Sequence, residues 1–205
     1  ENTNRGLKRI MKKQLSSLVP QLKIPSVYRF GLNSILFKQL KKLKQGIVLD
    51  IGPEDYLEKH IPHIGYIRFN TKNMTEIKLK HSSNYFDTVI ATHFLEHVVD
   101  PQKAVNEIYR VLKKEGICII SAPFIEHYHP NPKDYYRFSY DSLSHLFRKF
   151  GKVEIYHHGN KLQSIWQIFN IGVVKILLNF FNPLIYLIKF KKTRVPCGFV
   201  VYAEK

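Results

Sequence analysis

The sequence has 205 residues, of which 44% are hydrophobic, and its formal net charge is +16. This length suits one domain with a sizeable core, and the apolar content excludes a mainly disordered chain. The two cysteines, Cys118 and Cys197, form no CxxC pair. They exclude a disulfide framework and favour a reduced, cytoplasmic location.

The positive charge is concentrated in the N-terminal arm and in residues 38–44 and 189–194. These segments flank apolar stretches and contain few interleaved aromatic side chains. This pattern favours an anionic membrane surface, and so a peripheral membrane association, over a nucleic acid groove. A solvated, lysine-rich surface without a partner is the alternative.

Two regions follow from the apolar pattern. Residues 1–45 predict a basic, helical N-terminal extension, in which Val27–Lys44 carries an apolar stripe at helical spacing. Residues 46–205 predict one α/β domain. Its predicted strands, in chain order, are residues 47–52, 66–69, 74–79 (a weak strand), 87–91, 117–121, 153–157 and 198–203.

The middle of this domain predicts a strand–helix–strand unit. An apolar strand begins at Asp87, a helix opens at Pro101, Gly116 stops that helix, and Ile117 begins the next strand. Such a unit has a right-handed crossover in nearly all proteins. The polar loop over 92–97 lies where the first strand ends, and ligands of open α/β sheets bind at that edge.

A second predicted helix, residues 141–150, is capped by Asp141 and followed by Gly151. The most apolar part of the chain then lies within residues 160–192. Polar residues and Pro183 interrupt it, so it lacks the run of about 20 apolar residues that a transmembrane helix needs. We expect an apolar helical insertion, either packed on the core or lying in a membrane interface.

An ordered set of motifs carries a family resemblance. The motifs are Val48-Leu-Asp-Ile-Gly52, Phe86-Asp87, Leu95-Glu-His-Val98, Asp100-Pro101 and Glu107-x-x-Arg110-Val-Leu112. The chain thereby resembles class I S-adenosylmethionine-dependent methyltransferases, in particular the type 11 group. The resemblance implies a Rossmann-like, seven-stranded, mostly parallel sheet with helices on both faces and an antiparallel last strand. It also implies S-adenosylmethionine as the cofactor.

The cofactor-binding residues that the resemblance implies are Asp50, Gly52, Asn70, Thr92 and His93. A glycine turn lets the cofactor approach the backbone closely, and an acid at the end of the second strand accepts the ribose hydroxyls. This chain departs from that pattern three times, and one departure is that the adenine-side acidic residue expected near residues 81–84 is not evident. The turn after Gly52 has Pro-Glu-Asp-Tyr where the family places further glycines, and Asn70 stands where the family carries an acid.

The loops at the same edge are rich in histidine. We expect His93, His129 and Tyr136 to be catalytic, since a base is needed when the acceptor atom must lose a proton. We expect the acceptor to contact the side chains of Glu96, His97, His127 and Arg137.

Each group has a structural alternative. Arg137 could instead pair with Asp134 or Glu126 and stiffen the loop. His93, Glu96 and His97, joined by His127 or His129, have the residue types of a metal site. The alternative to a metal site is that Glu96 and His97 have structural roles, and we expect no metal.

The sequence favours methyl transfer to a hydroxyl or related group of a small molecule, a saccharide or a lipid-linked precursor of surface polysaccharide. The segment from His129 to Ser139 resembles a subgroup found with such pathways. A methyltransferase-like protein that lost catalysis and binds a membrane or partner is the second hypothesis. A nucleic acid methyltransferase is the third, supported by charge alone.

Overall fold

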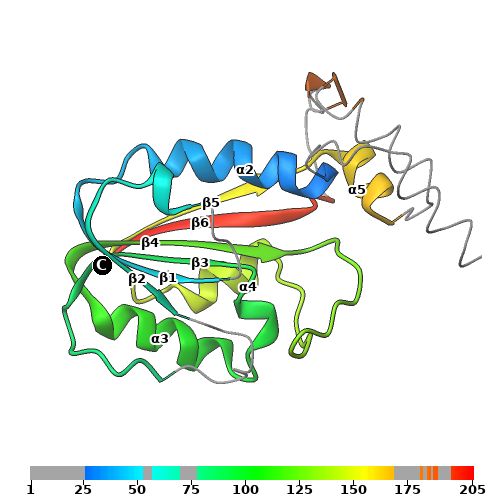
Figure 1. The fold of residues 1–205 in the computed structure, drawn as a ribbon. Helices are drawn as coiled ribbons and strands as arrows, with labels where there is room; N and C mark the ends of the chain where they lie inside the picture. Colours follow the sequence, from blue (N-terminus) through cyan, green and yellow to red (C-terminus); the bar gives the residue numbers. More distant parts are fainter. Residues whose placement is uncertain are drawn as a thin grey trace, which may run out of the picture.

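A six-stranded sheet forms the centre of the computed structural model, with the strand order β2-β1-β3-β4-β6-β5 (Figure 1). The structure describes residues 26–52, 57–69, 78–168, 181, 184–185, 187–188 and 195–205. The strands are β1 (Gly46–Ile51), β2 (His63–Phe69), β3 (Phe86–Thr92), β4 (Leu112–Pro123), β5 (Lys152–His158) and β6 (Gly198–Glu204).

The strand directions confirm a mostly parallel sheet with an antiparallel last strand. β1 pairs in parallel with β2 and β3, and β3 pairs in parallel with β4. β6 runs antiparallel to both of its neighbours, β4 and β5. The seventh predicted strand, over 74–79, falls mostly outside the described residues, and Leu79 belongs to no strand.

Helix α3 (Pro101–Val111) connects β3 to β4, as the strand–helix–strand unit predicts. The Asp100 carboxylate caps it by accepting a hydrogen bond from the Lys103 N–H at 3.0 Å. The predicted stop at Gly116 was wrong, because α3 ends at Val111 and the buried Leu112 already pairs with Phe86 in the sheet. The register then shifts before Ile117, so the intervening residues form an irregularity of β4 rather than a helical turn.

Helices cover both faces of the sheet, as predicted (Figure 1). Helix α2 (Val27–Leu40) contributes buried side chains to the core on one face, although the sequence placed it in an extension. Helices α3 and α4 (Tyr140–Leu146) lie on the other face, where the larger core cluster gathers. The predicted cap Asp141 was wrong, because Ser139 caps α4 through a reciprocal capping box with Ser142.

The Glu107-x-x-Arg110 motif fixes the chain segment that precedes β3. Arg110 donates hydrogen bonds to the carbonyl oxygens of Leu79 at 3.0 Å and His81 at 2.9 Å. Glu107 accepts from the Leu79 N–H at 2.9 Å and pairs with Arg110 at 2.7 Å. This ion pair lowers the pKa of Glu107 and raises that of Arg110. The motif therefore has a structural role: it holds residues 79–81 against α3.

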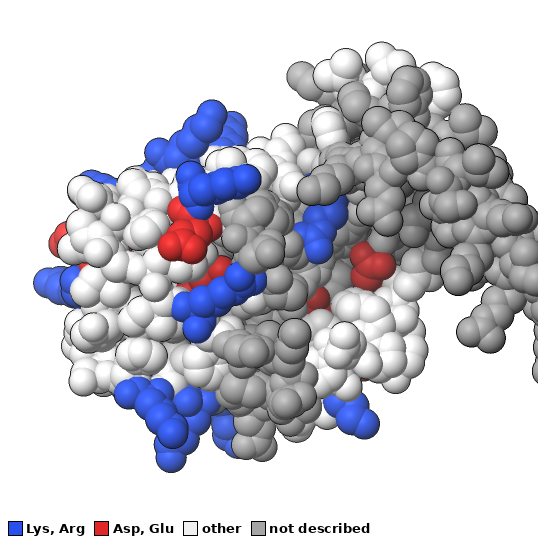
Figure 2. Space-filling view, in the orientation of Figure 1, with Lys and Arg blue, Asp and Glu red and all other residues white. Residues whose placement is uncertain are grey.

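Helix α5 (Lys161–Ile168) follows β5, and most of the predicted 160–192 insertion lies outside the described residues. The described parts of this region expose large apolar side chains: Leu162, Ile165, Ile168, Phe181, Leu184, Leu187 and Ile188. No helix within the described ranges has the length and hydrophobicity to cross a bilayer. On the face in Figure 2, the described Lys and Arg side chains form separate groups rather than one patch.

Candidate functional site

The carboxyl ends of β1 and β3 bring Gly52 and Thr92 into contact. The two strands are in register, with Ile51 opposite Ala91. A Cβ on Gly52 would lie 2.7 Å from Thr92 Oγ1 and 2.9 Å from its carbonyl oxygen. Packing against β3 thus requires a glycine here, independently of any cofactor. Within the described residues, the buried Thr92 Oγ1 has no hydrogen-bond partner.

Asp50 is buried at the same edge, on β1. Its Oδ2 accepts a hydrogen bond from the Tyr66 hydroxyl of β2 at 2.7 Å. Burial, together with this bond, raises the pKa of Tyr66 well above its usual range. The contact turns that oxygen of Asp50 toward β2. Asn70 and the turn over 53–56, two of the three departures from the family pattern, lie outside the described residues.

His93 follows β3 in a left-handed backbone conformation, with φ of 49°. Few residues other than glycine adopt this conformation without an energetic cost, and such positions cluster at functional sites. The hydroxyl of Ser121, at the end of β4, holds it by accepting the His93 N–H at 3.1 Å. The His93 Nδ1 lies 3.4 Å from Oε1 of Glu96. Ser121 is a supporting residue that the sequence did not reveal.

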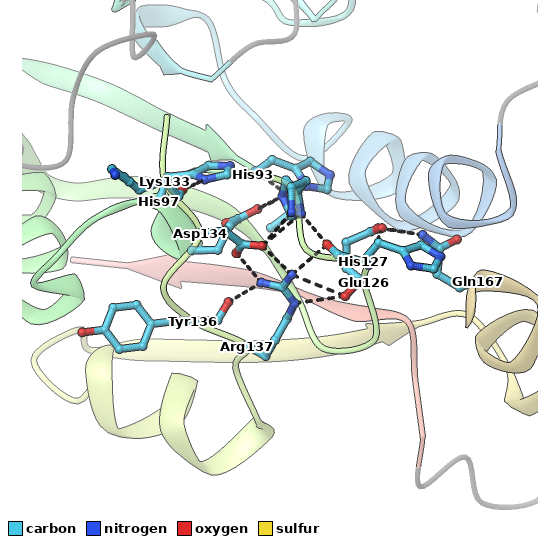
Figure 3. A network of polar contacts seen from close by, with 12 residues as sticks. His93, His97, Glu126, His127, Lys133, Asp134, Tyr136, Arg137 and Gln167 are labelled. Carbon is cyan, nitrogen blue, oxygen red and sulfur yellow. Dashed lines mark hydrogen bonds and ion pairs between the residues drawn. The ribbon is translucent and has the colours of Figure 1, made fainter. Parts of the chain in front are cut away.

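Glu96 and His97 belong to the short 3-10 helix η2 (Leu95–His97), which meets the long loop after β4. The Glu96 carbonyl accepts from the Tyr135 N–H at 2.8 Å, and His97 Nδ1 bonds the Lys133 carbonyl. Figure 3 shows His93 and His97 facing this loop. The fold therefore brings together the histidine-rich segments that the sequence separates by about 30 residues, as the shared sheet edge requires.

Arg137 is the centre of the loop's polar network (Figure 3). Its guanidinium donates to Asp134 Oδ2 at 2.8 Å and to the His127 carbonyl at 2.9 Å. The hydrogen bond from Arg137 holds the pKa of Asp134 at about 2. These contacts favour the loop-stiffening alternative for Arg137 over acceptor binding.

The remaining predicted side chains are more accessible. His127 is exposed, and the His129 side chain is 36% exposed. The Tyr136 hydroxyl donates to the Val99 carbonyl at 2.8 Å, which fixes the ring across the loop. His129 therefore lies between the buried Glu96 and solvent, where an acceptor could reach it.

Tyr28 and His158 form a buried pair next to the His93 ring, and no sequence pattern predicted it. Tyr28 of α2 lies with its ring centroid 5.1 Å from that of His93 and 4.6 Å from that of His158, at the end of β5. His158 is 1% exposed. Burial lowers its pKa to about 3, so the ring is neutral at pH 7. This contact depends on α2 and β5, which only the tertiary structure brings together.

Comparison with known proteins agrees with this geometry. Residues 30–120 match the family model described as "Methyltransferase domain". A SAM-dependent methyltransferase from Thermotoga maritima, described as a possible histamine N-methyltransferase, is 19% identical with a TM-score of 0.51, covering 87% of this chain and 91% of that one. Phosphoethanolamine N-methyltransferase 2 from Haemonchus contortus is 14% identical with a TM-score of 0.52, covering 84% of this chain and 51% of that one. No curated protein matches the sequence.

The fold is therefore a Rossmann-like α/β fold of the kind found in S-adenosylmethionine-dependent methyltransferases, and residues 30–120 match a methyltransferase domain model. The expected resemblance to class I S-adenosylmethionine-dependent methyltransferases is confirmed for the domain and for its fold.

Proposed function

We propose that the protein transfers a methyl group from S-adenosylmethionine to a hydroxyl or related group of a small molecule, a saccharide or a lipid-linked precursor. One observation carries the proposal. At the end of β3, Thr92 Oγ1 and His93 Nε2 are buried without a hydrogen-bond partner among the described residues, and Thr92 lies directly beside Gly52. Buried polar atoms are normally satisfied, so these atoms fit a polar ligand.

The described residues fit the cofactor at this edge. Asp50 and Gly52 of the β1 end, with Thr92 and His93 of the β3 end, would hold it. When bound, the cofactor would supply a methyl group on a sulfonium: the acceptor atom would attack that methyl carbon in line, and S-adenosylhomocysteine would leave. The chain's own contribution is to position the two reactants and to exclude water.

His93 is the residue we propose as the general base. A hydroxyl acceptor must lose a proton, and a histidine within reach can take it. The Glu96 carboxylate, 3.4 Å from His93 Nδ1, would pair with the resulting imidazolium. His129 and Tyr136 remain proposed catalytic residues at the more open side, and His97, His127 and Arg137 would line the acceptor side.

Binding of S-adenosylhomocysteine by calorimetry is the first test. Saturable binding is expected, and the absence of heat at millimolar ligand would refute the proposal. Methyl transfer from labelled cofactor is then measured on a panel of saccharides, lipid-linked sugars and amines; amines are included because one similar protein named above is an N-methyltransferase and the other is described as a possible one. His93→Ala should lower the rate by about 10²- to 10⁴-fold. His145→Ala, an exposed histidine of α4, is the matched control.

A membrane-associated role is supported by the exposed apolar side chains of the 162–188 region. Clusters of this kind mark membrane or protein contacts. The basic residues Lys189, Lys191 and Lys192 follow it in the sequence. Flotation with anionic vesicles, lost on neutralising these lysines, is expected. Equal flotation with neutral vesicles would refute the electrostatic part. A protein that floats but binds no cofactor would be the non-catalytic alternative.

A further inference from the structure

Glu96, His97 and His129 converge from two loops at the sheet edge. One ligand atom of each lies within 4.8 Å of the others. We propose that these three side chains form a binding site for a divalent transition-metal ion. The sequence favoured no metal here, whereas the geometry of the three side chains favours one.

The Glu96 carboxylate is buried and lacks hydrogen bonds from the part of the chain that the structure describes. The side chain is 0% exposed, and neither carboxylate oxygen accepts a hydrogen bond within the described residues. Among the described residues, the groups near Glu96 Oε1 that can carry a positive charge are two imidazoles: His93, whose Nδ1 is 3.4 Å away, and His129, whose Nε2 is 4.0 Å away. A buried carboxylate without hydrogen bonds is unfavourable unless a cation balances its charge.

Both histidines are oriented as metal ligands are. His97 Nδ1 bonds the Lys133 carbonyl, and His129 Nδ1 bonds the His127 carbonyl at 2.7 Å. Because a carbonyl oxygen can only accept, Nδ1 carries a proton in both rings, and in the neutral ring the lone pair on Nε2 is available to a metal. Ligating histidines commonly donate their other ring N–H to a backbone carbonyl in this way, which fixes the ring.

The nearest arginine does not replace the cation. Arg137 is bonded to both oxygens of Asp134, whose side chain is 1% exposed. This pair is neutral as a unit, and it leaves the charge of Glu96 without a permanent counter-ion among the described side chains around it. The Asp134 Oδ2 also accepts a hydrogen bond from the backbone N–H of His129 at 2.9 Å. The Arg137–Asp134 pair therefore positions the segment that carries one of the proposed ligands.

The donor set indicates the class of metal. Two imidazoles and one carboxylate suit zinc, manganese, iron or cobalt as divalent ions, whereas calcium and magnesium prefer oxygen ligands alone. Three protein ligands leave coordination positions open. At such a position a metal could polarise an acceptor oxygen. This catalytic role rests on the proposed methyl transfer, whereas metal binding itself is independent of that proposal.

The test uses the full, untagged chain after treatment with a chelator. Calorimetry with zinc chloride should show one ion per chain, and cobalt chloride should give visible d–d absorption bands. Glu96→Gln, which keeps the shape of the side chain, and His129→Ala should each weaken binding by at least the roughly 10- to 100-fold that loss of an outer-shell partner causes. His145→Ala should bind as the parent does.

Two results would overturn the proposal. One is no saturable binding of either metal by the folded parent. The other is unchanged affinity and cobalt bands in both variants, each shown to be folded by circular dichroism. These measurements contain no S-adenosylmethionine. A failure of cofactor binding therefore leaves the result for the metal unaffected, and the reverse also holds.

Discussion

The buried His158 should make the protein lose stability on mild acidification. Its ring lies against Tyr28, is 1% exposed, and has its pKa lowered by burial to about 3 from the ordinary 6.5. Because the folded pKa lies below the unfolded one, the unfolded chain binds the proton more readily. The contribution of His158 is therefore complete above about pH 6.5 and is lost as the pH falls toward 3.

The magnitude follows from the shift. For one proton, each pH unit below the unfolded pKa lowers the free energy of unfolding by about 1.4 kcal/mol. Between about pH 7.5 and about pH 5, the free energy of unfolding should thus fall by about 2 kcal/mol through this residue. The lower limit stays above the range in which most carboxylates titrate.

Urea denaturation at a series of pH values, with a chelator present, measures this difference. His158→Gln, which cannot titrate, should remove about that much of the pH dependence whatever its own stability. His157→Gln, the exposed neighbour on β5, is the control for removing a histidine. Equal slopes for the parent and the His158 variant would refute the assignment of a buried, neutral ring.

Three further variants test the packing by chemical denaturation. Gly198→Ala should cost about 1–3 kcal/mol, because the new methyl would lie 2.7 Å from a backbone carbonyl of β4. Gly65→Ala is its control, since the nearest atom there is 3.9 Å away; an equal loss in both would contradict the steric argument. Leu36→Ala should cost about 2–5 kcal/mol, since this side chain of α2 is fully buried, and a loss well under 1 kcal/mol would mean that α2 is not part of the core. Arg110→Ala should cost about 1–3 kcal/mol and increase amide exchange near Leu79, whose carbonyl it binds; unchanged exchange there would contradict that anchoring role.

The sequence predicted the elements whose pattern is local. The apolar run of β1 predicted that strand, and the apolar runs of β3 and β4, with the Asp100-Pro101 start of α3, predicted the strand–helix–strand unit. The end of α3 was missed because Leu112 is apolar at a helical spacing. Only its pairing with Phe86, a contact across the sheet, assigns it to β4. Similarly, Asp141 is a good cap by type, but the backbone of α4 places Ser139 at that position.

For the candidate site, the sequence predicted which residues lie together but not how their side chains are oriented or buried. Topology alone indicates that the loops after β3 and β4 meet, so His93, Glu96 and His129 could be grouped from the sequence. The ring orientations could not, because they depend on the carbonyls of Lys133 and His127. Burial of Glu96 is likewise a tertiary property, and it changes the interpretation of the cluster.

The antiparallel β6 has a consequence for how the chain can vary. It lies between β4 and β5, so its hydrogen bonds close the loop formed by residues 159–197. The entropy of closing a flexible loop rises only with the logarithm of its length, by about 0.6 kcal/mol for each doubling. Segments inserted between β5 and β6 should therefore lower the free energy of unfolding of the sheet very little. The same closure joins residues distant in sequence, which slows folding. An insertion between β5 and β6 should therefore slow folding of the domain more than it lowers the stability of the domain.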